Sequence, residues 1–238
     1  MLFGREHAAI YDLVYTERGK DYADEARQLN VLVRERRPDA VSLLDVACGT
    51  GSHLAALRPL FDRVEGAELA EAMLDVARRK LPGTVLSSAD MRDFDLGRRF
   101  DAVTCLYSSI AYLDESDVAK AIASMARHLN PGGVLVVEPW WHPEQATDNQ
   151  IRTDVITGEG LTVSRMSHGR IIGGAHHLEC HFLVSDGTEV RSFTDTQVLG
   201  VYPRELYVNA FEAAGLEVEV LREGLAGRGV YVGVLGRD

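Results

Sequence analysis

Residues 42–51 read Ser-Leu-Leu-Asp-Val-Ala-Cys-Gly-Thr-Gly, an apolar run that ends in an acid and a glycine-rich turn. The run is typical of a buried strand, and the glycines allow a sharp turn into a helix whose amino terminus can face a ligand. The third glycine of a dinucleotide-binding loop does not follow Gly49 and Gly51, and the Gly-Lys-Ser/Thr ending of a P-loop is missing. The stretch therefore predicts a ligand-binding strand-to-helix turn of another kind.

Further apolar runs follow this strand and alternate with helical patterns. The runs are RVEGAEL, TVLSSAD, FDAVTCLY and GVLVVEPWW, and the helical stretches include 53–60, 70–80 and 116–129. Strands that alternate with helices at this spacing form βαβ units, which build a parallel sheet covered by helices on both faces. A helical period predicts a further helix over Tyr22–Arg36, and residues 216–221 and 229–235 indicate a closing strand pair. We expect an α/β fold with a doubly wound, mostly parallel, seven-stranded sheet.

The pattern changes between residues 144 and 203. Short alternating segments, LTVSRMS, HHLECHFLV, VRSFTD and TQVLGV, are separated by glycine turns. Such segments predict an antiparallel β insertion after the fifth strand, laid over one end of the sheet. The chain is then a single domain over residues 1–238, and the open edge or face of the insertion offers a surface for a homodimer.

Composition limits the partners. The formal net charge is −11 and no long run of Lys and Arg occurs, which argues against nucleic acid as a partner. No apolar run is long enough to span a membrane, and the first twenty residues lack the apolar stretch of a signal peptide. The three scattered cysteines, Cys48, Cys105 and Cys180, suit the reduced thiols of a cytoplasmic protein.

Two acids end the next two predicted strands. The carboxylate of Glu68 can accept hydrogen bonds from both hydroxyls of a ribose. Asp90 can accept the exocyclic amine of an adenine, while the thioether of Met91 covers a face of the ring. Strand ends of this kind line the binding crevice of open α/β sheets, so the pattern predicts a ligand that contains a nucleoside.

The motifs DVACGTG, GAEL and ADMRDF resemble those of the class I S-adenosylmethionine-dependent methyltransferases, over residues 42–137. A closer resemblance spans nearly the whole chain. IYDL, GKDY, SSIAYL, GVLVVEPWW and GRGVYVGV are similar to motifs of the nucleotide-sugar N-methyltransferases, which dimethylate dTDP-amino-dideoxysugars in macrolide and related antibiotic pathways. The resemblance implies a Rossmann-like methyltransferase fold, S-adenosylmethionine as cofactor, and a dTDP-amino sugar as substrate.

The resemblance also implies a cofactor pocket, by position in this chain. The amino-terminal helices, residues 1–40, would close over the cofactor and bring Tyr11 and Tyr22 to it. The remaining residues implied in this pocket are Ala47, Gly49, Gly51, Glu68, Leu69, Asp90, Met91 and Leu106.

The acceptor pocket is expected around the paired indoles of Trp140 and Trp141, although two adjacent indoles at a strand end can also simply cap a sheet. Arg228 is expected to reach a phosphate, with a solvated surface position as the alternative. His181 is expected in the wall of this pocket, with a position in an interface as the alternative. Phe3 stands where some relatives carry a tyrosine, so a hydroxyl contact is lost there.

Tyr112 and Glu138 are the expected catalytic residues. Tyr112 stands where some relatives carry a histidine, and a phenol with a pKa of about 10 is a poor base near neutral pH. We therefore expect Tyr112 to orient the amine. Glu138 is expected to accept the proton, or to bind the amine or a sugar hydroxyl.

Other interpretations remain open at this point. His177, Glu179 and His181 share one strand face, a pattern compatible with a metal site, but side chains two apart share a face in any strand, and we expect no metal. A methyltransferase that acts on oxygen, on carbon or on another small amine fits the same core. A cofactor-binding sensor or scaffold without turnover fits it too.

Overall fold

The computed structural model describes residues 3–225 and 227–237. Its helices are α1 (Arg5–Glu17), α2 (Tyr22–Arg36), α3 (Ser52–Leu57), α4 (Glu71–Lys80), α5 (Glu115–Arg127) and α6 (Arg204–Ala213), with a short 3-10 helix η1 (Ser109–Tyr112). Its strands are β1 (Ser42–Val46), β2 (Arg63–Glu68), β3 (Val85–Ser88), β4 (Phe100–Cys105), β5 (Leu129–Val137), β6 (Gln150–Gly158), β7 (Leu161–Ile172), β8 (Ala175–Ser185), β9 (Val190–Gly200), β10 (Leu216–Leu221) and β11 (Val230–Leu235). No helix in the described part of the chain has the length and apolar character needed to cross a membrane.

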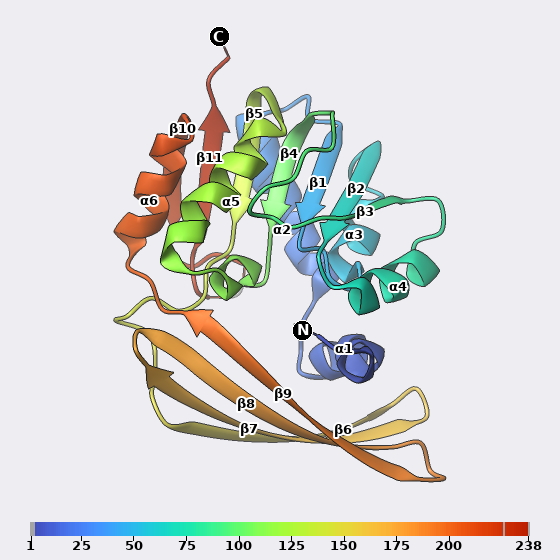
Figure 1. Cartoon of the computed structure of the whole chain (residues 1–238). Helices are drawn as coiled ribbons and strands as arrows, with labels where there is room; N and C mark the ends of the chain where they lie inside the picture. Colours follow the sequence, from blue (N-terminus) through green and yellow to red (C-terminus); the bar gives the residue numbers. More distant parts are fainter. Residues whose placement is uncertain (1–2, 226, 238) are drawn as a thin grey trace.

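Seven strands form one sheet in the order β10-β11-β5-β4-β1-β2-β3 (Figure 1). Strands β1 to β5 pair in parallel, and β11 runs antiparallel to both β5 and β10. The chain moves outward from β1 to β3, then crosses back to β4 on the other side of β1. This reversal creates a crevice at the carboxyl ends of β1 and β4, where open α/β sheets bind ligands. The expected fold class is confirmed.

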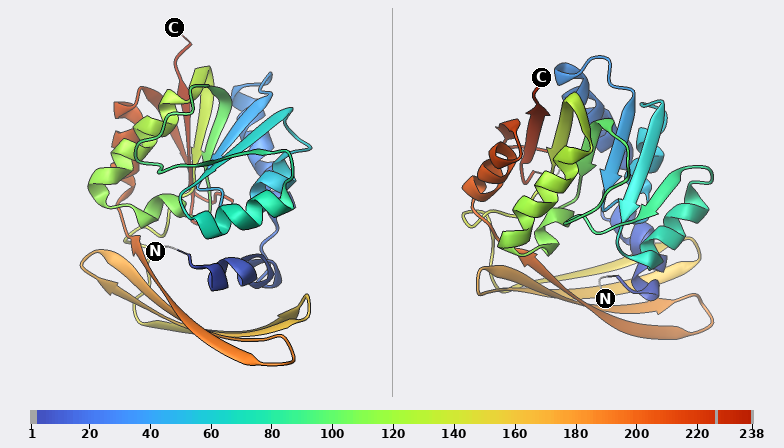
Figure 2. Two further views of the ribbon diagram at one scale, coloured as in Figure 1. Left: turned by 45° about the vertical axis from the view of Figure 1, so that its right-hand side comes forward. Right: turned by 45° about the horizontal axis from the view of Figure 1, so that its top comes forward.

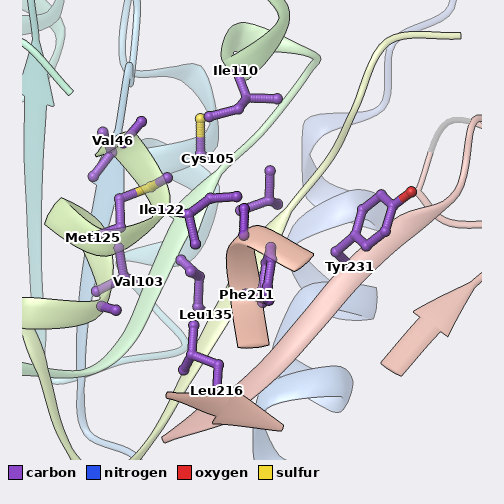
Figure 3. Packing of buried hydrophobic residues seen from close by; sticks show 14 of the residues in the cluster. Val46, Val103, Cys105, Ile110, Ile122, Met125, Leu135, Phe211, Leu216 and Tyr231 are labelled. Carbon is purple, nitrogen blue, oxygen red and sulfur yellow. The ribbon is translucent and has the colours of Figure 1, made fainter. Parts of the chain in front are cut away.

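Helices cover both faces of this sheet because consecutive residues of its central strands, which point to opposite faces, are both apolar and buried. Leu44 and Val103 face the cluster formed with α5 and α6, whereas Leu43 and Ala102 face the cluster formed with α2 and α3. Figure 3 shows Ile122 and Met125 of α5, with Phe211 of α6, packed around Val103 and Leu135 in the first cluster. The two clusters hold the crevice edge of the sheet in a fixed position.

The antiparallel insertion expected after β5 forms a second sheet in the order β6-β7-β8-β9. It lies across the crevice end of the larger sheet, with α1 between the two (Figures 1 and 2). Ile10, Leu13 and Val14 of α1 pack against Val163 and Phe182 on the inner face of this second sheet. The two segments predicted at VRSFTD and TQVLGV are a single strand, β9, and β6 precedes the first segment that the sequence indicated, LTVSRMS.

Candidate active site

A cavity of about 670 Å³ lies between the crevice, α1 and the inner face of the second sheet, a volume typical of small-molecule sites. One end is lined by residues that follow β1, β2 and β3, among them Ala47, Gly49, Glu68, Leu69, Asp90 and Met91, and we call it the acidic end. The other end is lined by Trp140, Trp141, Arg152, Arg165, His176 and Arg228, and we call it the basic end. The carboxylates of the lining, Glu68 and Asp90, therefore lie at the carboxyl ends of β2 and β3, and its arginines other than Arg18 and Arg92 belong to the basic end.

Glu68 anchors the acidic end. The residue is 8% exposed, and its carboxylate accepts hydrogen bonds from the backbone N–H groups of Gly49, at 2.9 Å, and Ala70, at 2.7 Å. Burial raises the pKa of Glu68, and the N–H groups of Ala70 and Gly49 act in the opposite direction. Ala47, with a φ of 57°, begins the turn that brings Gly49 to this carboxylate. Glu68 thus holds the glycine loop and faces the cavity at once.

Asp90 has a partner that the sequence did not indicate. The guanidinium of Arg92 donates to both carboxylate oxygens, with Nε at 3.0 and 3.1 Å, and the backbone N–H of Arg92 adds a further bond. These bonds hold the pKa of Asp90 below its usual value. Asp90 is therefore a charged, oriented carboxylate at the cavity wall beside Met91.

Three residues expected in the cofactor pocket do not line the cavity. Gly51 precedes α3 with a φ of 77°, and a side chain there would meet Leu81 at 2.8 Å, so its role is in the backbone. Leu106 is 4% exposed and belongs to the core cluster beneath α2. Tyr22 stacks edge-on against His53 with the ring centroids 4.9 Å apart. The side chains of Leu106 and Tyr22 thus lie outside the lining of this cavity, and their cofactor contacts stay a prediction.

Aromatic rings line the middle of the cavity. Tyr11 lines it as expected, and Tyr15, one helical turn later, lies with its ring centroid 4.5 Å from that of Tyr11. Tyr107, which follows β4, meets Tyr15 edge-on at 5.2 Å. The sequence reasoning missed Tyr15 and Tyr107, although the four-residue spacing of Tyr11 and Tyr15 places both on one helix face.

Helix α1 is fixed over the glycine loop by Asp12. One carboxylate oxygen accepts hydrogen bonds from the hydroxyls of Thr50, at 2.6 Å, and Ser52, at 2.7 Å, while the other accepts the ammonium of Lys80 at 2.6 Å. These bonds fix the position of α1, and with it the positions of Tyr11 and Tyr15 in the cavity wall.

Tyr112 and Phe3 close the cavity next to α1, with their rings edge-on at 5.7 Å. Burial raises the pKa of Tyr112 well above its usual value. Its hydroxyl consequently stays protonated near neutral pH, as a donor or acceptor of hydrogen bonds rather than as a base.

Glu138 lies behind the wall of the cavity and does not line it. It is fully buried, one oxygen accepts the backbone N–H of Tyr107 at 2.7 Å, and the other accepts Arg228 at 3.2 Å. Each oxygen thus accepts from a residue of the cavity wall, Tyr107 or Arg228, and proton acceptance by Glu138 stays a prediction. Its role is to hold Arg228 and the backbone of Tyr107.

Arg228 is a buried residue of the site and not a solvated surface residue. Its side chain is 10% exposed, and its guanidinium lies 5.3 Å from the ring centroid of Tyr107, 5.4 Å from Trp140 and 5.6 Å from Trp141. Three aromatic faces and the carboxylate of Glu138 therefore orient one cation at the basic end. The two indoles line the cavity as expected.

His181 does not reach the cavity. It lies on the outward face of the second sheet, where its side chain is 57% exposed and contacts Glu179 at 2.6 Å. The inward residues of β8 have even numbers, and His176, which is 8% exposed, lines the cavity in its place. Within the described residues, no group of three or more His, Cys, Asp or Glu side chains forms a metal site.

Comparisons with known proteins agree with this geometry. Residues 43–133 match the family model of a methyltransferase domain. The chain is 50% identical to the dTDP-3-amino-3,4,6-trideoxy-alpha-D-glucopyranose N,N-dimethyltransferase of Streptomyces venezuelae, over 96% of this chain and 98% of that protein. The crystal structure of DesVI from Streptomyces venezuelae superposes with a TM-score of 0.94 at 49% identity, over 98% of this chain and all of that one.

A structure with bound S-adenosylmethionine is also similar. It is that of CalS10 from Micromonospora echinaspora, an amino pentose methyltransferase involved in calicheamicin biosynthesis. The TM-score is 0.87 at 43% identity, and the match covers 98% of each chain.

Proposed function

The chain belongs to the family of sugar N-methyltransferases, and from that premise we propose that it transfers methyl groups from S-adenosylmethionine to the amine of a dTDP-linked amino-dideoxysugar in antibiotic biosynthesis. The observation that carries the proposal is the two-ended cavity, which pairs an acidic end with a buried, aromatic and basic end. An enzyme that joins two ligands at one reacting atom needs both ends to open into one space. The Streptomyces venezuelae relative that is 50% identical is an N,N-dimethyltransferase, so either one or two transfers are expected.

The acidic end fits S-adenosylmethionine in its chemistry. When bound, this cofactor supplies a methyl group already activated by its sulfonium. Glu68 would accept hydrogen bonds from its ribose hydroxyls. Asp90 would accept a hydrogen bond from the exocyclic amine of its adenine, at the carboxylate lone pairs that Arg92 leaves free. Met91 and Leu69 supply apolar surface for the rings. Tyr11 would cover the cofactor from α1.

The basic end fits a sugar diphosphate. Arg228 would hold the diphosphate, since its guanidinium is a buried cation that is oriented toward planar aromatic and oxyanion partners. Trp140 and Trp141 would stack on the sugar or on the thymine. Arg152 adds positive charge on the second sheet, where Arg165 is paired with Asp154 at 3.1 Å.

The task left to the protein is to place a neutral amine in line with the methyl group, about 3 Å from it. Burial among tyrosine and tryptophan rings disfavours the ammonium form of the acceptor and so lowers its pKa. The phenol of Tyr112 would accept a hydrogen bond from the amine and direct its lone pair. The proton of the amine is then lost to water or to Glu138.

Product mass spectrometry tests the proposal directly. Incubation with S-adenosylmethionine and dTDP-amino sugars should add 14 or 28 mass units, that is, one or two CH₂ equivalents, and thymidine diphosphate should compete. Free amino sugars serve as the matched control, because they lack the remote binding energy of the nucleotide. If thymidine diphosphate at millimolar concentration fails to inhibit while free amines are good substrates, a broader small-molecule methyltransferase replaces this proposal. Cofactor binding without turnover on any amine would identify a sensor or scaffold.

The proposal includes a cytoplasmic homodimer. The cytoplasmic location rests on three free thiols. The dimer rests on the outward face of the second sheet, where Ile151, Val155, Met166 and Leu183 are 52–76% exposed. Sedimentation of wild type and Val155→Lys should separate a dimer from a monomer, and identical sedimentation as monomers would exclude it.

A further inference from the structure

One hydrogen bond joins the two sheets across the basic end. The indole N–H of Trp140, just beyond β5, donates to Nδ1 of His176 on β8 at 3.2 Å. Their ring centroids are 5.9 Å apart and the rings are tilted by 43°, so they do not stack face to face. The hydrogen bond, and not ring stacking, therefore sets the orientation of the indole.

The bond also fixes the protonation of the imidazole. An indole nitrogen only donates, so Nδ1 of His176 must be the unprotonated nitrogen and Nε2 must carry the hydrogen. Burial lowers the pKa of His176, which keeps the ring neutral at neutral pH. Within the described residues, Nε2 is buried and has no hydrogen-bond partner. In the described part of the chain, the hydrogen bond to Trp140 is thus the one side-chain hydrogen bond of this ring.

Gly169 on β7 makes room for this imidazole. A Cβ atom on Gly169 would lie 2.3 Å from Nε2 of His176 and 3.2 Å from its Cε1. Gly169 has no positive φ, so the glycine is required by this close approach and not by the backbone conformation. The second sheet is thus shaped to receive the ring that holds Trp140.

We propose that His176 is a positioning residue for the acceptor, acting through the indole of Trp140. The guanidinium of Arg228 lies over the ring of that indole, 5.4 Å from its centroid, so rotation of the indole would displace the cation as well. His176 therefore sets the affinity for the sugar nucleotide while leaving the acidic end unaffected. The inference rests on the proposed function, whose own test is turnover by the wild-type protein.

The two imidazole nitrogens can be tested separately with amide variants. His176→Asn places an amide oxygen near the position of Nδ1 and can still accept the indole N–H. His176→Gln places its amide near Nε2 and leaves Trp140 without an acceptor. We expect His176→Gln to raise the Kd for thymidine diphosphate and the KM for the sugar nucleotide about tenfold, the scale of one lost hydrogen bond, and His176→Asn to raise them about threefold at most.

Three further measurements complete the test. The Kd for S-adenosylmethionine should stay within about twofold in both variants, since a general loss of structure would move both ligands. In a Trp140→Phe background, His176→Gln should add less than about twofold, because the donor is already gone. Nitrogen-15 NMR of the imidazole should report hydrogen on Nε2 at pH 7. His177→Gln, on the outward face of the same strand, is the control.

Several outcomes would overturn the inference. Equal effects of Asn and Gln at position 176, full additivity with Trp140→Phe, or hydrogen on Nδ1 would each do so. If the wild-type protein neither binds thymidine diphosphate nor methylates a dTDP-amino sugar, the proposed function fails instead, and the NMR result still decides how the ring is held.

Discussion

The two ends of the cavity are built by different means. At the acidic end, Glu68 bonds to the backbone N–H groups of Gly49 and Ala70, and Asp90 bonds to Arg92, two positions away in the sequence. At the basic end, side chains bond to side chains far away in the sequence, as Glu138 does to Arg228, 90 positions apart. Backbone anchoring makes the acidic end a property of the loops, whereas the basic end depends on each partner in a chain of contacts. The effect of a single substitution should therefore reach more residues at the basic end than at the acidic end.

The largest effect should come from breaking the buried ion pair. Glu138→Ala leaves the guanidinium of Arg228 buried without its carboxylate and the N–H of Tyr107 without its acceptor. Removing one partner of a buried pair costs about 3–5 kcal/mol in unfolding free energy. We expect a loss of this size in urea unfolding, together with loss of thymidine diphosphate binding.

A matched control exists on the second sheet. Glu179→Ala removes one partner of the exposed pair with His181 and should cost less than about 1 kcal/mol. If Glu138→Ala costs no more than this control, the basic end is not held by Glu138 and the contrast between the two ends is wrong.

The next largest effect is expected at the acidic end. Glu68→Ala should weaken S-adenosylmethionine binding by about 2–4 kcal/mol, because charge-assisted bonds to the ribose and the anchoring of the glycine loop are both lost. Calorimetry should show thymidine diphosphate binding unchanged. Glu71→Ala, exposed at the start of α4, is the control. Cofactor affinity within twofold of wild type for Glu68→Ala would remove Glu68 from the cofactor site.

The same contrast explains what could be predicted from the sequence. Glu68 and Asp90 each end an apolar run, and parallel strand ends meet at one edge, so local pattern was enough to place them at the cavity. The sequence could not decide between the cavity wall and an interface for His181, because a strand's alternation does not say which face turns inward. The apolar residues Cys180 and Phe182 on the inner face were a usable signal, since they place even-numbered positions, and hence His176, inside.

Arg228 shows a further limit of the sequence. Glycines on either side indicate an exposed turn, and nothing local indicates that Tyr107 and Trp140 surround the guanidinium. These contacts join residues from three separate segments. They appear only when the segments after β4, β5 and β10 meet at one edge of the seven-stranded sheet.

A smaller effect is expected where the two ends meet. Tyr112→Phe should lower kcat by roughly tenfold, the value of one neutral hydrogen bond of about 1–1.5 kcal/mol, with both ligand affinities little changed. Because burial raises the pKa of Tyr112, the rate should show no ionisation of this phenol below about pH 10. A loss beyond about a thousandfold would show that Tyr112 is an acid–base group.

The smallest effect should come from adding a single methyl group at the basic end. Gly169→Ala puts a Cβ atom 2.3 Å from Nε2 of His176, so the imidazole must move and its bond to Trp140 must stretch. A weakened bond of about 0.5–1 kcal/mol corresponds to a rise of roughly two- to fivefold in the KM for the sugar nucleotide. Gly236→Ala, where a Cβ atom meets nothing within 4 Å, should leave the KM unchanged.

The decisive comparison is made in a His176→Ala background. With the ring gone, the added methyl group has nothing to displace, so Gly169→Ala should cause no further rise in KM. If the rise persists without the imidazole, the methyl group acts on β7 itself and not through His176. The backbone of the second sheet would then form a rigid wall of the basic end. The basic end would be held by backbone at this position, as the glycine loop holds Glu68 at the acidic end, and the two ends would no longer differ here.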